Sequence, residues 1–185
     1  WTVNIGMALE NIRKWQWINR MNEKINRMWK YDMLTQVLNR SGFFYCAETI
    51  LQKIKEEKSN AFIIFLDIDG LKSVNDNLGH EIGDAFIAKI AGILKEVVPK
   101  DCLIMRYGGD EFVVFGSCKQ AGRMQRIAED IKAAIKTADQ KENRSYHLAA
   151  SLGCSLHKSY EMDNLNSLIE LADKKMYEEK KNKRR

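Results

Sequence analysis

Several features of common protein classes are scarce in this 185-residue chain. It has one proline, three histidines and four cysteines, and the cysteines are far apart in the sequence. Their spacing argues against a zinc site or a disulfide framework and favours reduced thiols in a core. No apolar run approaches the roughly 18 residues that a membrane-spanning helix needs, and no secretory signal is visible. We therefore expect a cytoplasmic domain with no membrane insertion of its own, or the cytoplasmic portion of a membrane-anchored sensor.

The positive charge is concentrated at the two ends of the chain. Of the net charge of +5, residues 1–40 and 171–185 together carry +8, which leaves −3 in the middle. A nucleic-acid-binding domain usually has a continuous basic face, so this distribution argues against nucleic acid as a partner. Basic ends around an acidic centre suit a site that holds a metal ion and phosphate groups.

Residues 1–31 form a region distinct from residues 32–185. Apolar side chains recur there at spacings of three and four residues, in two series that shift by one residue between Trp15 and Ile18. This pattern predicts an amphipathic linker helix with coiled-coil character. Its tryptophans, including Trp17 and Trp29, are more than one helix face can cover, so we expect a dimerising helix rather than one packed on its own domain.

The remaining sequence predicts alternating helices and strands. The expected order is a helix at 43–58, a strand at 61–66, a polar loop at 67–83, a helix at 86–97, hairpin strands at 102–105 and 112–115, a helix at 120–138, a strand at 146–156 and a helix from 165. Such an order predicts an α/β fold in which helices cover the faces of a sheet.

The expected hairpin has an unusual tip, Arg106-Tyr107-Gly108-Gly109-Asp110-Glu111-Phe112. The two glycines allow a bulky anion to approach the main chain. The adjacent carboxylates of Asp110 and Glu111 repel each other unless a cation or a proton separates them. This tip therefore predicts a site for a divalent metal and a polyphosphate.

A second acidic cluster follows the predicted strand at 61–66. Of Asp67 and Asp69, we expect only one to face the site, namely Asp67, because it is the first polar group after the strand. If the hairpin pairs beside this strand, Asp67 and Asp110 lie close enough to share magnesium ions. Farther along, an asparagine with a carboxylate, such as Asn75 with Asp84, has the donors and acceptors to read a purine edge. Taken alone, Asn75-Asp76 is more often a turn or a helix cap than a purine-reading pair.

With both clusters in view, the chain from about Asp32 to Arg185 resembles the GGDEF family of diguanylate cyclases. The resemblance rests on five motifs: Asp32-Met33-Leu34-Thr35 with Asn39-Arg40, Asp67-x-Asp69-x-x-Lys72-x-x-Asn75-Asp76, Gly79-His80-x-x-Gly83-Asp84, the hairpin signature itself, and Ala172-Asp173-x-x-Met176-Tyr177-x-x-Lys180. It implies a palm-like nucleotide-cyclase fold with a mostly antiparallel central sheet. It also implies that two domains face each other as a homodimer and join two GTP into cyclic di-GMP, releasing two pyrophosphates.

The resemblance also implies roles for individual residues. Asp67, the carbonyl of Ile68 and Asp110 match the ligands of Mg²⁺, for which Mn²⁺ can substitute, and Glu111 matches the carboxylate that helps deprotonate the attacking 3′-hydroxyl. The substrate-binding positions are Asn75 and Asp84 for guanine, and Lys72, Lys180, Arg184, the amides of Gly70 and Leu71, and the glycines Gly108 and Gly109 for the phosphates. An upstream sensor domain is also expected.

Three positions depart from the family pattern, and one departure concerns regulation. Gln36 replaces a usual glycine and Leu71 a common phenylalanine, neither of which supplies a side-chain ligand. Many members carry an Arg-x-x-Asp product-binding site just ahead of the signature, whereas this chain has Pro99 and Cys102 there. We therefore expect no product inhibition through that site.

Two other functions compete with the cyclase. The stronger is a non-catalytic domain that binds GTP or cyclic di-GMP and signals to a partner, although such domains usually lose signature residues that this chain keeps. The weaker is a palm-type cyclase that acts within one nucleotide, and no second metal-binding aspartate cluster or adenine-reading pattern supports it.

Overall fold

The computed structural model describes residues 2–141, 146–158 and 164–183, with side chains from Gly6 onward. The helices and strands are α1 (Thr2–Lys30), α2 (Arg40–Glu56), β1 (Asn60–Ile68), α3 (Leu71–Leu78), α4 (His80–Val97), β2 (Leu103–Arg106), β3 (Glu111–Cys118), α5 (Arg123–Lys141), β4 (Ala150–His157) and α6 (Leu165–Lys183).

The four described strands form one antiparallel sheet in the order β2-β3-β1-β4. The expected hairpin is present, since β2 pairs with β3, and β3 pairs in turn with β1. The central strand β1 is buried along its whole length after Asn60, which explains its continuous apolar run. The palm-like α/β architecture with an antiparallel sheet is thus confirmed.

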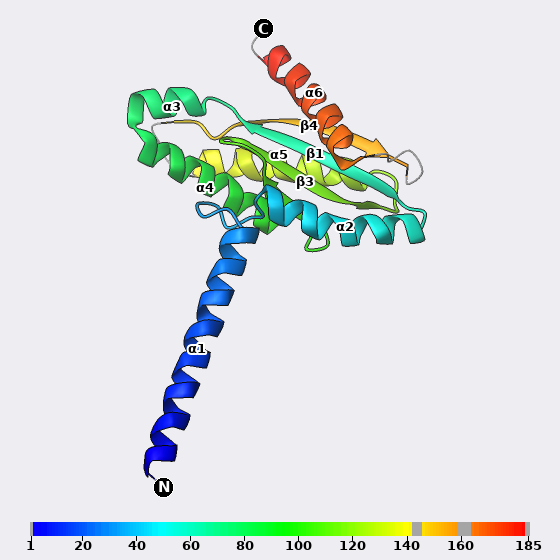
Figure 1. Ribbon diagram of the computed structural model, residues 1–185. Helices are drawn as coiled ribbons and strands as arrows, with labels where there is room; N and C mark the ends of the chain where they lie inside the picture. Colours follow the sequence, from blue (N-terminus) through cyan, green and yellow to red (C-terminus); the bar gives the residue numbers. More distant parts are fainter. Residues whose placement is uncertain (1, 142–145, 159–163, 184–185) are drawn as a thin grey trace.

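Helices cover both faces of the sheet, as Figure 1 shows. Successive residues of β1 point to opposite faces of the sheet. Phe62, Ile64 and Leu66 belong to the core formed with α4 and α5. Ile63 and Phe65 belong to the core formed with α2 and α6. The next residue on the α6 face is Asp67, so the alternation that builds the core also directs this carboxylate toward α6.

The prediction of a polar loop at 67–83 was wrong. β1 continues to Ile68, α3 occupies Leu71–Leu78, and α4 begins at His80 rather than Phe86. α3 is only eight residues long, and its apolar residues Leu71, Val74 and Leu78 are separated by polar residues that are common in loops. It begins after Gly70, whose φ of 80° lies in the left-handed region that favours glycine.

α1 projects from the domain as a single helix (Figure 1). Asn39 fixes its base: the Nδ2 of Asn39 donates to the carbonyl of Trp29 at 2.9 Å, and its Oδ1 accepts from the amide of Gly42 at 2.9 Å. One side chain therefore caps the end of α1 and the start of α2. A β-carbon on Gly42 would lie 2.1 Å from the carbonyl oxygen of Lys30, so this joint requires glycine.

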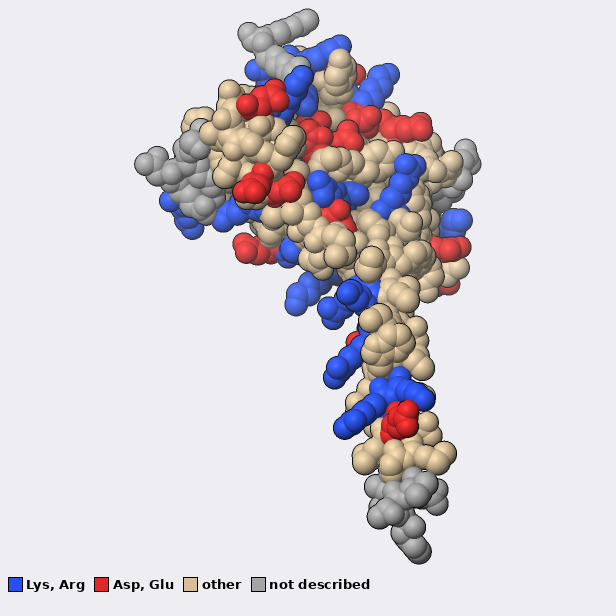
Figure 2. Space-filling model, turned by 60° about the vertical axis from the view of Figure 1, so that its left-hand side comes forward, with Lys and Arg blue, Asp and Glu red and all other residues tan. Residues whose placement is uncertain are grey.

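The side chains of α1 from Gly6 to Trp29 are all exposed. They include many large apolar groups, namely Met7, Leu9, Ile12, Trp15, Trp17, Ile18, Met21, Ile25, Met28 and Trp29. Figure 2 shows the projecting helix with basic side chains among broad uncharged areas. The domain thus leaves the apolar side chains of α1 uncovered. Within the described residues, no helix combines the length and the apolar character needed to cross a bilayer.

Candidate active site

Asp67 and Glu111 are direct partners across the β1–β3 ladder. Residues opposite each other on antiparallel strands project to the same face, with β-carbons about 5 Å apart. The amide of Ile68 donates to the carbonyl of Asp110 at 3.0 Å, so the pairing extends one residue into the hairpin tip. The sheet register therefore brings the two acidic clusters of the sequence together, as the sequence predicted.

The hairpin tip is a tight turn stabilised by its own backbone. The carbonyl of Glu111 accepts hydrogen bonds from the amides of Tyr107 and Gly108, at 2.8 and 3.4 Å. A β-carbon on Gly108 would lie 2.5 Å from Oε2 of Glu111, so glycine at this position leaves room for the carboxylate. Gly109 is exposed, and nothing lies near the place its β-carbon would take. One glycine accommodates Glu111 and the other leaves the tip open.

Arg106 ties this tip to the start of the domain. Its Nη2 donates to the carbonyl of Gly109 at 2.8 Å, and its Nη1 donates to both carboxylate oxygens of Asp32 at 3.1 and 3.2 Å. Burial alone would raise the pKa of Asp32, but hydrogen bonds from Thr35 and Arg106 lower it below its usual range. Asp32 is thus held ionised where α1 enters the domain, and Arg106 connects it to the hairpin tip.

Lys180 on α6 forms an ion pair with Asp67. Both side chains are largely buried, with 20% of Lys180 and 12% of Asp67 exposed. Lys180 therefore offsets the negative charge of Asp67 in this largely buried position. The pairing confirms the expectation that the basic C-terminal helix reaches the carboxylate site.

The acidic groups raise one another's pKa values. Burial raises the pKa of Asp67, the charges of Asp110 and Asp69 raise it further, and Lys180 opposes the shift. Burial also raises the pKa of Glu111, and the charges of Asp110, Asp67 and Asp173 add to the effect. The mutual repulsion of these carboxylates is what a cation site shows in the absence of its ion's charge.

The donor set suits Mg²⁺. Among the described residues no three acidic, histidine or cysteine side chains are grouped closely enough to bind a metal by themselves. Mg²⁺ commonly takes only one or two carboxylates and completes its shell with water and substrate phosphates. Asp67 and Asp110, joined through the backbone at Ile68, offer such a set of oxygen ligands. We therefore expect the metal to bind together with a nucleotide.

Asn75 and Asp84 come from two helices that meet beside the site. Asn75 lies on α3 and Asp84 on α4, next to Gly83. A β-carbon on Gly83 would lie only 1.8 Å from Oδ1 of Asn75, so the asparagine amide packs directly against this glycine. Asn75 thus contacts the residue that precedes Asp84 in α4, and the carboxylate of Asp84 is exposed.

The remaining predicted ligands lie around the start of α3 or outside the described residues. Gly70 precedes the helix, Leu71 is buried in its first turn, and Lys72 is exposed. The amides at the start of a helix have no partners within it and can receive phosphate oxygens. Arg184 falls outside the described residues.

Three residues at the site were not predicted from the sequence. Asp173 on α6 adds negative charge near Glu111, and burial raises its own pKa. Ser151 on β4 donates to Asp69 at 2.8 Å, and Lys183 donates to Asp69 at 3.1 Å. Lys180 and Lys183 are three residues apart on one helix, a spacing that places both on the same face and that could have suggested the second lysine.

Positions 99 and 102, where many family members carry the Arg-x-x-Asp pair, have no charged side chain in this protein. Cys102 is buried, and burial raises the pKa of its thiol to about 11. Arg123 donates to both carboxylate oxygens of Asp101, at 2.6 and 2.7 Å. The expectation that no product inhibition acts through positions 99 and 102 stays a prediction.

Comparison with known sequences identifies similar proteins. The sequence profile of the family described as "Diguanylate cyclase, GGDEF domain" matches residues 29–185. Diguanylate cyclase A of Treponema denticola is 29% identical over 180 residues, covering 95% of this chain and 48% of that protein. Diguanylate cyclase VdcA of Vibrio cholerae is 32% identical over 168 residues, covering 88% of this chain and 48% of that protein. The chain thus spans about half the length of these relatives.

Solved structures share the fold. The coiled coil and GGDEF domain of DgcB from Caulobacter crescentus, solved in complex with c-di-GMP, covers 96% of this chain and 94% of its own, with a TM-score of 0.83 and 23% identity. The GGDEF domain of PA1120 from Pseudomonas aeruginosa covers 82% of this chain and 89% of its own, with a TM-score of 0.70 and 26% identity.

Proposed function

The chain belongs to the GGDEF domain family, and on that basis we propose that it is a diguanylate cyclase that condenses two GTP into cyclic di-GMP and two pyrophosphates. The observation that carries the proposal is the pairing of Asp67 with Glu111 across β1 and β3, with Lys180 bound to Asp67. A nucleoside triphosphate binds with a metal ion, for which carboxylates are ligands, and its phosphates are bound by basic side chains such as lysine. The domain is then the output part of a bacterial signalling protein, with residues 1–31 as its linker helix and 32–185 as the catalytic unit.

In this proposal Glu111 accepts the proton of the 3′-hydroxyl of one GTP while that oxygen attacks the α-phosphorus of the other. A new phosphodiester bond forms and pyrophosphate leaves. A general base works best when its pKa lies close to the working pH, and the raised pKa of Glu111 moves it in that direction. A second, symmetric step closes the ring.

The other residues hold the substrate in the same proposal. Asn75 and Asp84 bind the guanine edge, while Lys72, Lys180 and Arg184 bind the phosphates together with the amides of Gly70 and Leu71. Asp67, Asp110 and the Ile68 carbonyl would hold Mg²⁺ or Mn²⁺. When bound, the ion supplies charge stabilisation at the phosphates and at the departing pyrophosphate. The glycines at 108 and 109 leave room for the nucleotide.

Each domain supplies half of the reaction centre, because one site holds one GTP. The exposed apolar side chains of α1 favour a second copy of the chain as the partner that covers them. Asn39 fixes α1 to α2, so a pairing of α1 helices would restrict how two domains face each other. The homodimer is therefore part of the proposed mechanism.

A concentration series tests the proposal. Pyrophosphate release from GTP and Mg²⁺ is measured across a range of protein concentrations, with the fraction of dimer determined by light scattering. We expect the rate per chain to rise with concentration and to level off when the dimer is complete. A verified dimer that binds GTP but releases no pyrophosphate would instead identify a non-catalytic binding domain.

Gly83→Ala should weaken GTP binding without unfolding the protein. The new methyl group would lie 1.8 Å from Oδ1 of Asn75, and the asparagine side chain must turn away because it is the movable partner. Loss of a purine-reading hydrogen bond is expected to raise KM for GTP about tenfold. Steady-state kinetics and a thermal melt measure the two effects.

Asn75→Ala provides the matched comparison for this prediction. Since both changes act through the same amide, the double variant should bind GTP no more weakly than Asn75→Ala alone. Additive losses would mean that Gly83 acts by another route than Asn75.

Glu111→Gln should raise the thermal stability of the metal-free protein at pH 7, by about 3 °C. A carboxyl whose folded-state pKa is raised destabilises the folded state whenever it is ionised. The difference from wild type should therefore shrink as the pH falls through the raised pKa of Glu111. Thermal melts from pH 7 to pH 4 measure this difference in stability. A Glu111→Gln protein that is less stable than wild type at pH 7 would contradict the claim that burial and neighbouring carboxylates destabilise the ionised Glu111.

A further inference from the structure

Lys180 and Lys183 lie on the same face of α6 but differ in how fully they are bound. Among the described residues, the ammonium of Lys180 has one acceptor, Asp67. The ammonium of Lys183 donates to Asp69 at 3.1 Å, to the carbonyl of Ala150 at 2.7 Å and to Oγ of Ser151 at 3.2 Å. A lysine has three N–H groups, so Lys183 uses all of its donors within the protein.

Asp69 is held from several directions on the β4 side of β1. Its carboxylate accepts from the hydroxyl of Ser151 at 2.8 Å, and its amide donates to the carbonyl of Ala149 at 2.9 Å. Ser151 is fully buried and stands opposite Asp67 in the β1–β4 register. β3, which carries Glu111, lies on the other side of β1. Asp69 is therefore directed away from the hairpin and toward the end of α6.

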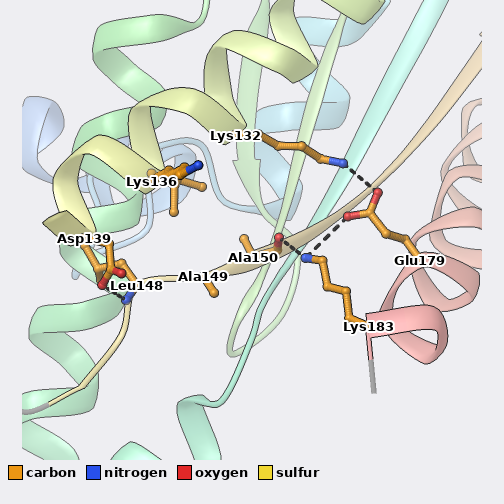
Figure 3. A pocket seen from close by; sticks show the side chains of 9 residues that line it. Lys132, Lys136, Asp139, Leu148, Ala149, Ala150, Glu179 and Lys183 are labelled. Atoms are coloured by element: carbon orange, nitrogen blue, oxygen red, sulfur yellow. Dashed lines mark hydrogen bonds and ion pairs between the residues drawn. The ribbon is translucent and has the colours of Figure 1, made fainter. Parts of the chain in front are cut away.

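Ion-paired side chains line part of the cavity beside this contact. It has a volume of about 300 Å³ and lies between α5, β4 and α6 (Figure 3). Glu179 on its wall accepts from Lys132 at 2.7 Å and pairs with Lys183 at 3.4 Å, as Figure 3 shows. The lysines here join α6 to α5 and β4, so the cavity marks a structural joint.

We propose that Lys183 is a positioning residue that clamps the end of α6 onto Asp69, so that Lys180 can exchange Asp67 for the phosphates of GTP without α6 moving. The inference rests on the proposed function, because it assigns Lys180 to the phosphates. Asp67 would release the Lys180 ammonium if it held a metal ion, and Lys183 would then keep the end of α6 on Asp69. Asp69, the second carboxylate of the Asp67-x-Asp69 motif, is in this view an anchor for α6 and not a metal ligand.

Hydrogen–deuterium exchange on the metal-free, nucleotide-free chain tests the clamp independently of any catalysis. Lys183→Met should speed the exchange of amides in residues 176–183 and 67–70 about tenfold, the size expected when charged hydrogen bonds are lost. Lys183→Arg should restore slow exchange.

Lys132→Met is the matched control, because it removes another ion pair of α6, the one between Lys132 and Glu179, without touching Asp69. Binding of a non-hydrolysable GTP analogue with Mg²⁺ is then measured for the same variants. We expect Lys183→Met to weaken binding about tenfold, Lys132→Met to weaken it less than twofold, and, in the active enzyme, KM to change more than kcat. If exchange or analogue binding is the same in Lys183→Met and Lys132→Met, the proposed role of Lys183 is wrong. If exchange and binding change as predicted but the wild-type chain shows no turnover, only the proposed cyclase activity is wrong.

Discussion

Glu111→Gln should reduce the formation of cyclic di-GMP at least about 1000-fold while GTP binding stays within a few-fold of wild type. Glutamine keeps the size of the side chain and its place beside Gly108 but cannot accept a proton from the 3′-hydroxyl. Glu111 is assigned to the attacking hydroxyl and not to the metal, so the affinity for nucleotide should depend on it little. Turnover is measured by product chromatography and affinity by titration with a non-hydrolysable GTP analogue.

Two further variants make this result specific. Glu178→Gln removes an exposed carboxylate from α6 and should leave turnover unchanged. Asp110→Asn removes a proposed metal ligand and should reduce both turnover and metal-dependent nucleotide binding. Equal loss of binding in Glu111→Gln and Asp110→Asn would contradict the separate roles given to these adjacent carboxylates.

Gly153→Ala should destabilise the fold strongly, by about 3 kcal/mol or more. Gly153 lies on β4 beneath α6, and a β-carbon there would lie 2.1 Å from the carbonyl oxygen of Ala172 and 2.2 Å from the amide nitrogen of Met176. Both contacts are with backbone, so no side chain can turn away, and α6 itself must be displaced. Urea denaturation monitored by circular dichroism measures the loss.

The matched control is Gly92→Ala on α4, where nothing lies within 4 Å of the added methyl group. Alanine favours a helix over glycine by about 1 kcal/mol, so this variant should be slightly more stable than wild type. A Gly153→Ala protein as stable as wild type would show that α6 is not packed tightly on β4. Since α6 carries Lys180, a soluble Gly153→Ala protein should also bind GTP poorly.

The order and type of most elements could be predicted because their patterns are local. β1 is a continuous apolar run, and the only proline, Pro99, follows α4 closely. α3 was missed because its eight residues bury only Leu71 and Val74, and its polar side chains resemble those of a loop. β1 was predicted to end two residues too early because Asp67 interrupts the apolar run, although β1 continues to Ile68.

The candidate site could be predicted where it depends on motifs, and less where it depends on register. The carboxylates at 67, 110 and 111 were recognised from the glycine hairpin and from the strand end before α3. The contacts of Asp69 were not, because they require Ser151 to stand opposite β1 and Lys183 to lie over it. That register is set by packing between distant parts of the chain, on which no local pattern reports.

The identity of the product formed from GTP tests the central claim most directly. The chain, verified as a dimer by light scattering, is incubated with GTP and Mg²⁺, and the nucleotides are separated by chromatography and identified by mass spectrometry. We predict cyclic di-GMP with two pyrophosphates released for each molecule formed, and no product from Glu111→Gln. Bound GTP that is recovered unchanged, or a cyclic mononucleotide as the product, would contradict the assignment of this domain as a diguanylate cyclase.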